Sequence, residues 1–198
     1  MINFSPIVES KTNPSLPKYD GVKMSLEQYL SHSFEEEAYK YEWNEGILES
    51  EEKMKIKEAI LFRNLRNRFI KNYPSGNYEI LSEITCPLST QKKVRIPDIG
   101  IFKYEDIKNY TLGNSLVPIL AIEIISPLNQ AEELEQKIKE YFLEGVKSVW
   151  CIYPNLKQIK IHESFKQTTN YSKSDTCTFN YLDIQFSISV NEVFQDFS

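Results

Sequence analysis

One apolar segment constrains the fold of this chain more than any other feature. Residues Leu116 to Ile125 form the longest apolar run, and this run contains a single acidic residue, Glu123. It is too short to cross a bilayer as a helix. A continuous apolar run of this length is typical of a strand that is buried on both faces of a sheet. The segment therefore predicts a sheet that is covered on both sides.

Two long segments have the apolar spacing of amphipathic helices, Lys53–Asn72 and Asn129–Glu144. Asn129 is the expected N-cap of the second helix, and Gly145 is its expected C-cap. A short helix is expected after Ser25, and a loop over residues 105–115. Strands are expected over residues 41–44, 47–49, 78–88 with a possible break at Pro87, 94–102, 117–125, 146–153 and 156–162, and a strand pair is expected over 176–188. This order predicts an α/β (α+β) fold, with a mixed β-sheet flanked by helices.

The length of 198 residues is sufficient for one domain with a substantial core. Residues 1–22 contain three prolines and no clear periodicity, which predicts an irregular N-terminal arm before a single domain over residues 23–198. The three cysteines, Cys86, Cys151 and Cys177, lack the spacing of a disulfide framework or a zinc site. A reduced, cytoplasmic protein without a membrane segment is therefore expected.

The sequence also excludes several catalytic chemistries. It has only two histidines and contains no HExxH, GxGxxG or P-loop motif. If the chain is an enzyme, its carboxylates and lysines must therefore carry the reaction.

The net charge of −5 disfavours a protein that simply coats nucleic acid. Basic residues nevertheless cluster in two places, which are Lys53, Lys55, Lys57, Arg63, Arg66, Arg68 and Lys71 in the first and Lys92, Lys93 and Arg95 in the second. Either a local nucleic-acid-binding face or a solvated helix face with a polar turn would explain them.

Glu123 is the most informative candidate residue. A lone carboxylate in a buried strand costs on the order of several kcal/mol unless it is paired or neutralised. A metal ion or a lysine could offset that cost. A structural carboxylate paired with a buried tyrosine or arginine is the alternative.

Asp98 and Lys137 are weaker candidates when each is taken alone. Asp98 follows Pro97, which cannot donate to a strand ladder and so marks a strand start, an edge or a bulge. Such positions redirect side chains toward sites, although an aspartate there can equally cap a turn. Lys137 borders the buried stripe of the second helix, and the alternative is a surface lysine paired with Glu133.

Together the three residues have a consistent chemistry. Two carboxylates can hold a hard divalent cation such as Mg²⁺, which stabilises charge on a phosphate and makes a water molecule more acidic. A nearby lysine can orient that water and offset the phosphate charge.

Four segments combine into a specific pattern. They are Ile96–Ile99 (IPDI), Glu123–Pro127 (EIISP), Tyr41–Gly46 (YEWNEG) and the spaced residues Lys137, Tyr141, Gly145, Val146 and Trp150. Over about residues 24 to 163 the sequence resembles the Uma-two family of restriction-endonuclease-like proteins, which belongs to the PD-(D/E)XK nuclease superfamily. The resemblance implies a restriction-endonuclease-like sheet flanked by helices.

The resemblance also implies roles for individual residues. Asp98, Glu123 and the main-chain carbonyl of Ile124 correspond to metal ligands. The superfamily's lysine normally lies two residues after the glutamate, where this chain has Ile125, so the resemblance points to Lys137 instead.

Two further acidic residues, Glu83 and Glu42, are implied as accessory carboxylates, with the weaker case for Glu42. Many relatives carry a histidine early in the first long helix, where this chain has Lys57. Relatives also carry an acidic residue where this chain has Ile47. Any contribution of the first long helix to catalysis is therefore in doubt.

The function predicted from the sequence is a Mg²⁺- or Mn²⁺-dependent DNA endonuclease. Asp98, Glu123 and Lys137 would be its catalytic residues, and Lys57 and Arg63 would contact the DNA backbone. A homodimer is implied by family analogy only. A catalytically inactive nuclease-fold module that binds DNA or a protein is the alternative, and the overall acidity favours it.

Overall fold

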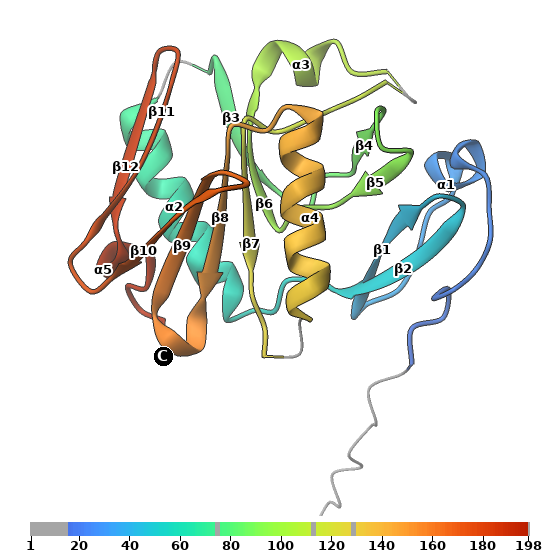
Figure 1. Cartoon of the computed structure of the whole chain (residues 1–198), viewed down its shortest axis with the longest axis horizontal. Coiled ribbons are helices and arrows are strands. Elements are labelled where there is room, and N and C mark those ends of the chain that lie inside the picture. Colours follow the sequence, from blue (N-terminus) through green and yellow to red (C-terminus); the bar gives the residue numbers. More distant parts are fainter. Residues whose placement is uncertain (1–15, 74–75, 112–113, 128–129, 198) are drawn as a thin grey trace, which may run out of the picture.

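A large mixed sheet with helices on both faces forms the centre of the molecule (Figure 1). The structure is a computed structural model, and it describes residues 16–73, 76–111, 114–127 and 130–197. The helices are α1 (Leu26–Ser31), α2 (Glu58–Asn72), α3 (Tyr104–Lys108), α4 (Ala131–Glu144), α5 (Val190–Val193) and the 3-10 turn η1 (Pro154–Leu156). The strands are β1 (Tyr39–Asn44), β2 (Ile47–Glu52), β3 (Tyr78–Ser82), β4 (Cys86–Leu88), β5 (Lys93–Arg95), β6 (Ile99–Lys103), β7 (Leu120–Ile124), β8 (Ser148–Tyr153), β9 (Gln158–Ser164), β10 (Gln167–Ser172), β11 (Thr176–Tyr181) and β12 (Ile184–Ser189).

The strands form three sheets. The large sheet has the order β10-β9-β8-β7-β6-β3, the smaller one has the order β2-β1-β5-β4, and β11 pairs with β12. Within the large sheet β7 and β8 are parallel, whereas its other neighbouring strands are antiparallel. The parallel pair is joined through α4, because parallel neighbours need a crossover connection. The expected mixed sheet flanked by helices is therefore confirmed.

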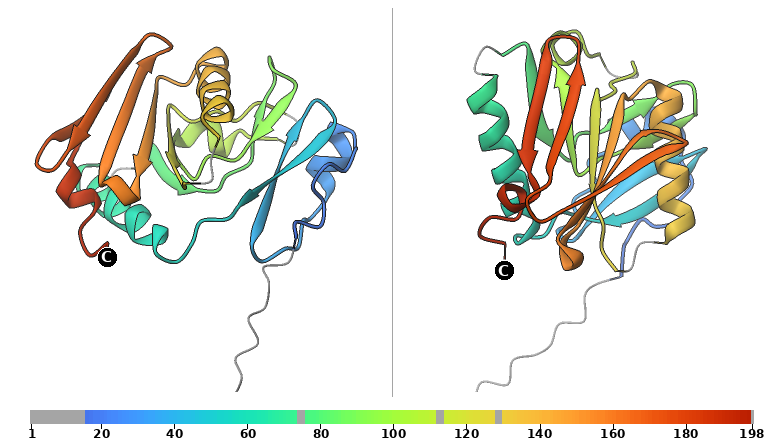
Figure 2. Two further views of the ribbon diagram at one scale, coloured as in Figure 1. Left: turned by 60° about the horizontal axis from the view of Figure 1, so that its bottom comes forward. Right: turned by 60° about the vertical axis from the view of Figure 1, so that its left-hand side comes forward.

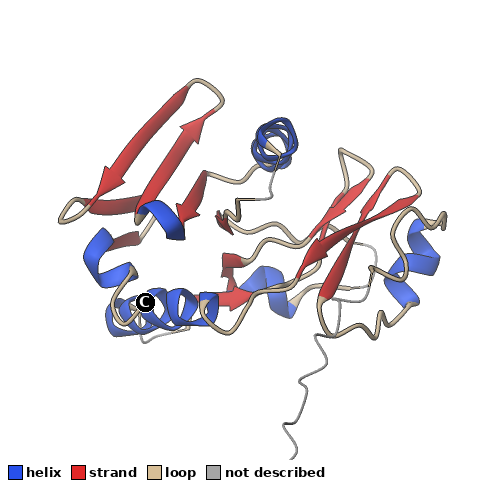
Figure 3. Cartoon of the chain, turned by 90° about the horizontal axis from the view of Figure 1, so that it is seen from below, coloured by secondary structure: helices blue, strands red, loops and turns tan. Residues whose placement is uncertain are grey.

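The central strand β7 is buried on both faces, as its apolar sequence predicts. Ile122 and Ile124 lie in the core that α2 covers, together with Leu65. Ala121 lies in the core that α4 covers, together with Ile138. Seen from below, α2 and α4 lie on opposite sides of the large sheet (Figure 3). Strand alternation therefore directs Glu123 toward α4.

Two chain crossings connect the large sheet to the smaller one. Strand β3 of the large sheet is followed by β4 of the smaller sheet, and β5 of the smaller sheet is followed by β6 of the large one. The crossings are short, and they contain Glu83 and Pro97-Asp98. Glu83 has a positive φ of 52°, and its amide donates to the Asp98 carbonyl at 3.1 Å. The two acidic residues are therefore neighbours where the chain passes between the sheets. Figure 2 shows the smaller sheet beside the large one.

Several expected boundaries were wrong. The first long helix begins at Glu58 rather than Lys53. The Met54 amide donates to Glu83 Oε1 (2.9 Å), and this contact holds the residues before Glu58 outside the helix. The expected strands 78–88 and 94–102 are each divided, at the two crossings. The expected loop 105–115 contains helix α3, and strand β10 was not anticipated.

Other expectations hold within the described residues. The short N-terminal helix begins after Ser25, whose side chain forms a capping box with Gln28. Gly145 ends α4 with a φ of 104°, a conformation that favours glycine. The N-cap expected at Asn129 lies outside the described residues, as does most of the expected arm over residues 1–22. Among the described helices, none is long and apolar enough to span a membrane.

Candidate active site

Glu123 lies near the carboxyl end of β7 and faces α4. The residue is only 4% exposed, and its Oε1 accepts a hydrogen bond from the Tyr141 hydroxyl at 2.6 Å. Its Oε2 lies 3.6 Å from the Lys137 ammonium. Both partners come from α4, which returns across this face of the sheet because it connects β7 to β8. Glu123 therefore has both kinds of partner that the sequence left open: a buried tyrosine, expected for a structural carboxylate, and a lysine, expected for a catalytic one.

Asp98 lies beside the end of β7, at the crossing between the two sheets. Pro97 interrupts the strand there, which frees Asp98 from a sheet ladder. Its Oδ2 accepts a hydrogen bond from the Ile124 amide at 2.7 Å, and its Oδ1 accepts one from the Lys40 ammonium at 2.7 Å. The Asp98 carboxylate is therefore fixed next to the residue that follows Glu123.

Lys137 is buried rather than solvated. Its ammonium donates to both carboxylate oxygens of Glu51, at 2.8 and 3.0 Å, and lies 3.1 Å from Glu42 Oε1. Burial disfavours the charged form, but Glu123, Glu42 and Glu51 outweigh it and hold the lysine pKa well above its usual range. Lys137 therefore pairs with Glu51 and Glu42 and is not a surface lysine paired with Glu133, which was the alternative from the sequence.

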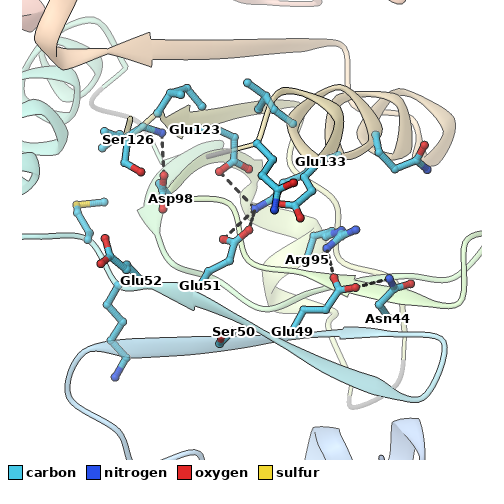
Figure 4. Close-up of a pocket in the computed structure, with 18 of the residues that line it drawn as sticks. Asn44, Glu49, Ser50, Glu51, Glu52, Arg95, Asp98, Glu123, Ser126 and Glu133 are labelled. Carbon is cyan, nitrogen blue, oxygen red and sulfur yellow. Dashed lines mark hydrogen bonds and ion pairs between the residues drawn. The ribbon is translucent and has the colours of Figure 1, made fainter. Parts of the chain in front are cut away.

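A cavity of about 740 Å³ brings Asp98, Glu123, Ile124 and Lys137 together at the carboxyl end of β7. In Figure 4 Asp98, Glu123 and Glu51 point toward one another across this cavity. Its acidic side chains outnumber its basic ones by nine to four. They are Asp20, Glu49, Glu51, Glu52, Glu58, Asp98, Glu123, Glu132 and Glu133 against Lys53, Lys93, Arg95 and Lys137. The cavity is thus suited to a cation.

The electrostatics at Glu123 show the same excess of negative charge. Burial, together with the charges of Asp98 and Glu51, raises the pKa of Glu123 to about 8, although Lys137 and Lys40 oppose the shift. The arrangement therefore favours the protonated form of this carboxyl more than water does, and a bound cation would oppose that preference.

Metal-free protein is accordingly expected to lose stability as the pH rises from about 4.5 to about 8. The folded state keeps a proton on Glu123 in this range, whereas the unfolded state releases it. Glu123→Gln removes this contribution, so the variant should gain on the order of 2 kcal/mol relative to wild type between pH 5 and pH 8. Urea unfolding in EDTA measures the difference, with the exposed Glu163→Gln as control. Equal pH slopes in wild type and Glu123→Gln would contradict the assignment.

Glu42 belongs to a cluster of ion pairs at one side of the cavity, which Arg95 and Lys93 help to line. Arg95 lies 2.6 Å from Glu42 and 2.8 Å from Glu140, and Lys93 lies 2.6 Å from Glu140. Both carboxylates are fully buried. Burial opposes ionisation of Glu42, but Lys137 and Arg95 outweigh it and lower its pKa to about 2. The cluster joins β1 and β5 to α4.

Arg95→Met is expected to destabilise the protein by about 3 kcal/mol, because it leaves two buried carboxylates without their shared guanidinium. Urea unfolding measures this loss. The exposed pair of Arg63 and Asp196, 2.9 Å apart, provides the control, since Arg63→Met should cost less than about 1 kcal/mol. Equal losses in the two variants would show that burial does not matter here.

The two basic residues expected to contact DNA, Lys57 and Arg63, lie at different places relative to the cavity. Lys57 precedes α2 and is exposed near the cavity, which Met54 and Glu58 help to line. Arg63 lies farther along α2, on the helix that covers the opposite face of the sheet. The structure therefore brings together Asp98, Glu123, Ile124 and Lys137, with Glu42 and Glu83 nearby, but not Arg63.

Sequence reasoning missed two charged residues at the site, Glu51 and Lys40. Glu51 comes from β2 and binds Lys137, and Lys40 comes from β1 and binds Asp98. The β1–β2 hairpin reaches the site from the smaller sheet (Figure 1). The only sequence signal was their place in that hairpin, beside the Tyr41–Gly46 motif.

The donor set fits a hard divalent cation. Carboxylates and main-chain carbonyls are the ligands that Mg²⁺ prefers. Asp98, Glu123 and Ile124 line the same cavity. Burial is the main cause that raises the pKa of Glu123, and the charges of Asp98 and Glu51, which a cation would offset, add to it. Over the described residues, no group of three or more His, Cys, Asp or Glu side chains is already arranged around a common metal position.

Comparisons with known proteins agree with this fold. A solved structure described as that of a "putative nuclease belonging to DUF820" from Anabaena variabilis matches with a TM-score of 0.68 and 18% identity. The match covers 86% of this chain and 97% of that one. The comparison with curated proteins returned no match. The model of the Uma2 family, described as "Putative restriction endonuclease", matches residues 26–191, and the chain therefore belongs to the Uma2 family.

Proposed function

We propose that this chain is a metal-dependent endonuclease that hydrolyses phosphodiester bonds in DNA, with Mg²⁺ or Mn²⁺ as its ion. One observation carries the proposal: Asp98, Glu123 and Lys137, from three different segments of the chain, line one cavity. Membership of a family described as restriction endonucleases supports the same reaction class.

The proposed metal ligands are the carboxylates of Asp98 and Glu123 and the carbonyl of Ile124. When bound, the ion would stabilise negative charge on the scissile phosphate and make a water molecule more acidic. The protein positions these ligands beforehand, because the Tyr141 hydroxyl holds Glu123 and the Ile124 amide holds Asp98.

Lys137 is the proposed cationic contact for the phosphate and the orienting group for the attacking water. Glu51 and Glu42 hold its ammonium in place. Glu42 is thus an accessory carboxylate that acts through Lys137. Glu83 is proposed as the second accessory carboxylate, because it fixes the Met54 amide at the edge of the cavity.

Incubation of the purified chain with supercoiled plasmid in Mg²⁺, Mn²⁺ or EDTA tests the proposal. Nicked or linear product with either ion, and none in EDTA, is the expected result. Cleavage that persists in EDTA would exclude metal dependence. The absence of product with both ions would favour the second candidate described below.

Lys57, which precedes α2, and Arg63, which lies within it, are proposed to bind DNA rather than to take part in the reaction. Replacing Lys57 and Arg63 with alanine should weaken DNA binding uniformly across sequences and lower the salt slope by about one per lost phosphate contact. Mn²⁺ binding should be unchanged. DNA titrations at several salt concentrations, with each single variant alongside the double one, measure the effect. An unchanged slope would mean that α2 is not the DNA face.

The acidic cavity favours a second candidate, a nuclease-fold module that binds DNA or a protein without cutting. Nine acidic side chains at the cavity would repel phosphates in the absence of bound cations. The two candidates differ in the plasmid assay, since only the first predicts product that requires the ion.

The proposed setting is the cytoplasm, where DNA is accessible and thiols stay reduced. Cys86, Cys151 and Cys177 are free, buried thiols, which suits that compartment. Cutting both strands of a duplex generally needs two active sites, and a homodimer is therefore proposed as the working form.

A further inference from the structure

The environment of Lys40 resembles that of a bound metal ion. Its side chain is 5% exposed, and its ammonium donates to the Ile96 carbonyl at 2.9 Å and to Asp98 Oδ1 at 2.7 Å. Carboxylate oxygens of Glu51 and Glu83 lie 3.8 and 3.9 Å away. Four oxygens from three segments of the chain, which contain Glu51, Glu83 and the pair Ile96 and Asp98, therefore lie around one cation.

These oxygens belong to three carboxylates and one main-chain carbonyl. Hard divalent cations prefer such oxygen ligands. The Lys40 ammonium lies between these oxygens and supplies one positive charge from the protein itself. Its position is fixed by two main-chain elements, since Lys40 belongs to β1 and Ile96 follows β5. A divalent ion could enter this position only if the ammonium left it.

The charges of the inner site fit one divalent ion. Four carboxylates (Asp98, Glu123, Glu51 and Glu83) contact or adjoin two ammonium groups (Lys40 and Lys137). With every group ionised, four negative and two positive charges leave a net charge of minus two.

The neighbouring cluster adds one partly exposed negative charge to this balance. Arg95 and Lys93 carry two positive charges, their buried partners Glu42 and Glu140 carry two negative ones, and the partly exposed carboxylate of Glu49 lies 3.2 Å from Arg95. One divalent cation therefore neutralises the inner site, and a second would leave its four carboxylates and two ammonium groups with a net positive charge.

We propose that Lys40 is a built-in cation that takes the place of a second divalent ion, so that the site binds one metal ion per chain. The inference rests on the proposed function, because it takes the pair Asp98 and Glu123 as the metal site. Lys40 is a positioning residue in this scheme: it holds Asp98 and adjusts the charge of the site.

Calorimetric titration of the full chain with Mn²⁺ alone tests the inference. Wild type should bind one ion per chain. Lys40→Met, which removes the ammonium at similar length, and Lys40→Gln, which keeps a hydrogen-bond donor for Asp98, should each bind a second Mn²⁺. The exposed Lys55, paired with Glu52 at 2.7 Å, provides the matched control, since Lys55→Met should still bind one ion.

Two Mn²⁺ ions per wild-type chain would overturn the inference, as would a single ion in both folded Lys40 variants. If neither variant folds, the number of Mn²⁺ ions that each wild-type chain binds decides whether the inference stands. Failure of the proposed function is a separate result: a wild-type chain that binds no Mn²⁺ and does not nick plasmid refutes both, whereas a chain that binds two ions and cuts DNA refutes only the role of Lys40.

Discussion

Glu123→Gln is expected to lower DNA cleavage by about 10³-fold while the fold survives. The substitution preserves the volume of the side chain and removes the anion that a divalent cation requires. The amide oxygen can still accept the hydrogen bond of Tyr141, and Lys137 keeps its contacts with Glu51 and Glu42. Plasmid cleavage in Mg²⁺ measures the loss of activity, and circular dichroism of the same sample shows whether the fold survives.

Glu163→Gln is the matched control, because Glu163 is an exposed carboxylate of β9. It should cut DNA at the wild-type rate. Unfolding of Glu123→Gln would show that Glu123 is a structural residue. Cleavage at the wild-type rate would show that the reaction does not depend on this carboxylate.

Lys137→Met is expected to lower the cleavage rate by about 10²-fold or more and to leave Mn²⁺ binding intact. The variant removes the cationic contact for the phosphate, whereas Asp98, Glu123 and the Ile124 carbonyl remain. The loss should therefore appear in kcat and not in metal affinity, which Glu123→Gln should abolish. Single-turnover cleavage and Mn²⁺ titration of both variants separate the two roles.

Retention of activity in Lys137→Met would remove the lysine from the mechanism. Loss of metal binding together with activity would mean that Lys137 only supports the site. Lys137→Arg gives a further comparison, because it keeps the charge but not the compact ammonium.

Local sequence patterns were sufficient for the central elements of the fold. The apolar run that becomes β7 predicted a strand buried on both faces, and the periodic segment that ends at Gly145 predicted α4. Because α4 connects two parallel strands, its inner face necessarily lies over the strand that carries Glu123. The juxtaposition of Glu123 and Lys137 therefore follows from adjacent elements.

Long-range packing explains what the sequence did not reveal. Lys40 and Glu51 reach the site because the β1–β2 hairpin packs against it from a different sheet. The charged sequence of β2, Ile-Leu-Glu-Ser-Glu-Glu, does not show which carboxylate turns inward. The start of α2 was misplaced for a similar reason, since the contact of Met54 with Glu83 joins segments 29 residues apart.

The most direct test of the central claim is anomalous diffraction from crystals of the full chain grown with Mn²⁺. The account predicts one strong anomalous peak per chain, bounded by the carboxylates of Asp98 and Glu123 and the carbonyl of Ile124, with the Lys137 ammonium close by. A chain that cuts DNA in Mn²⁺ but binds the ion elsewhere, or shows no peak between these groups, would contradict it.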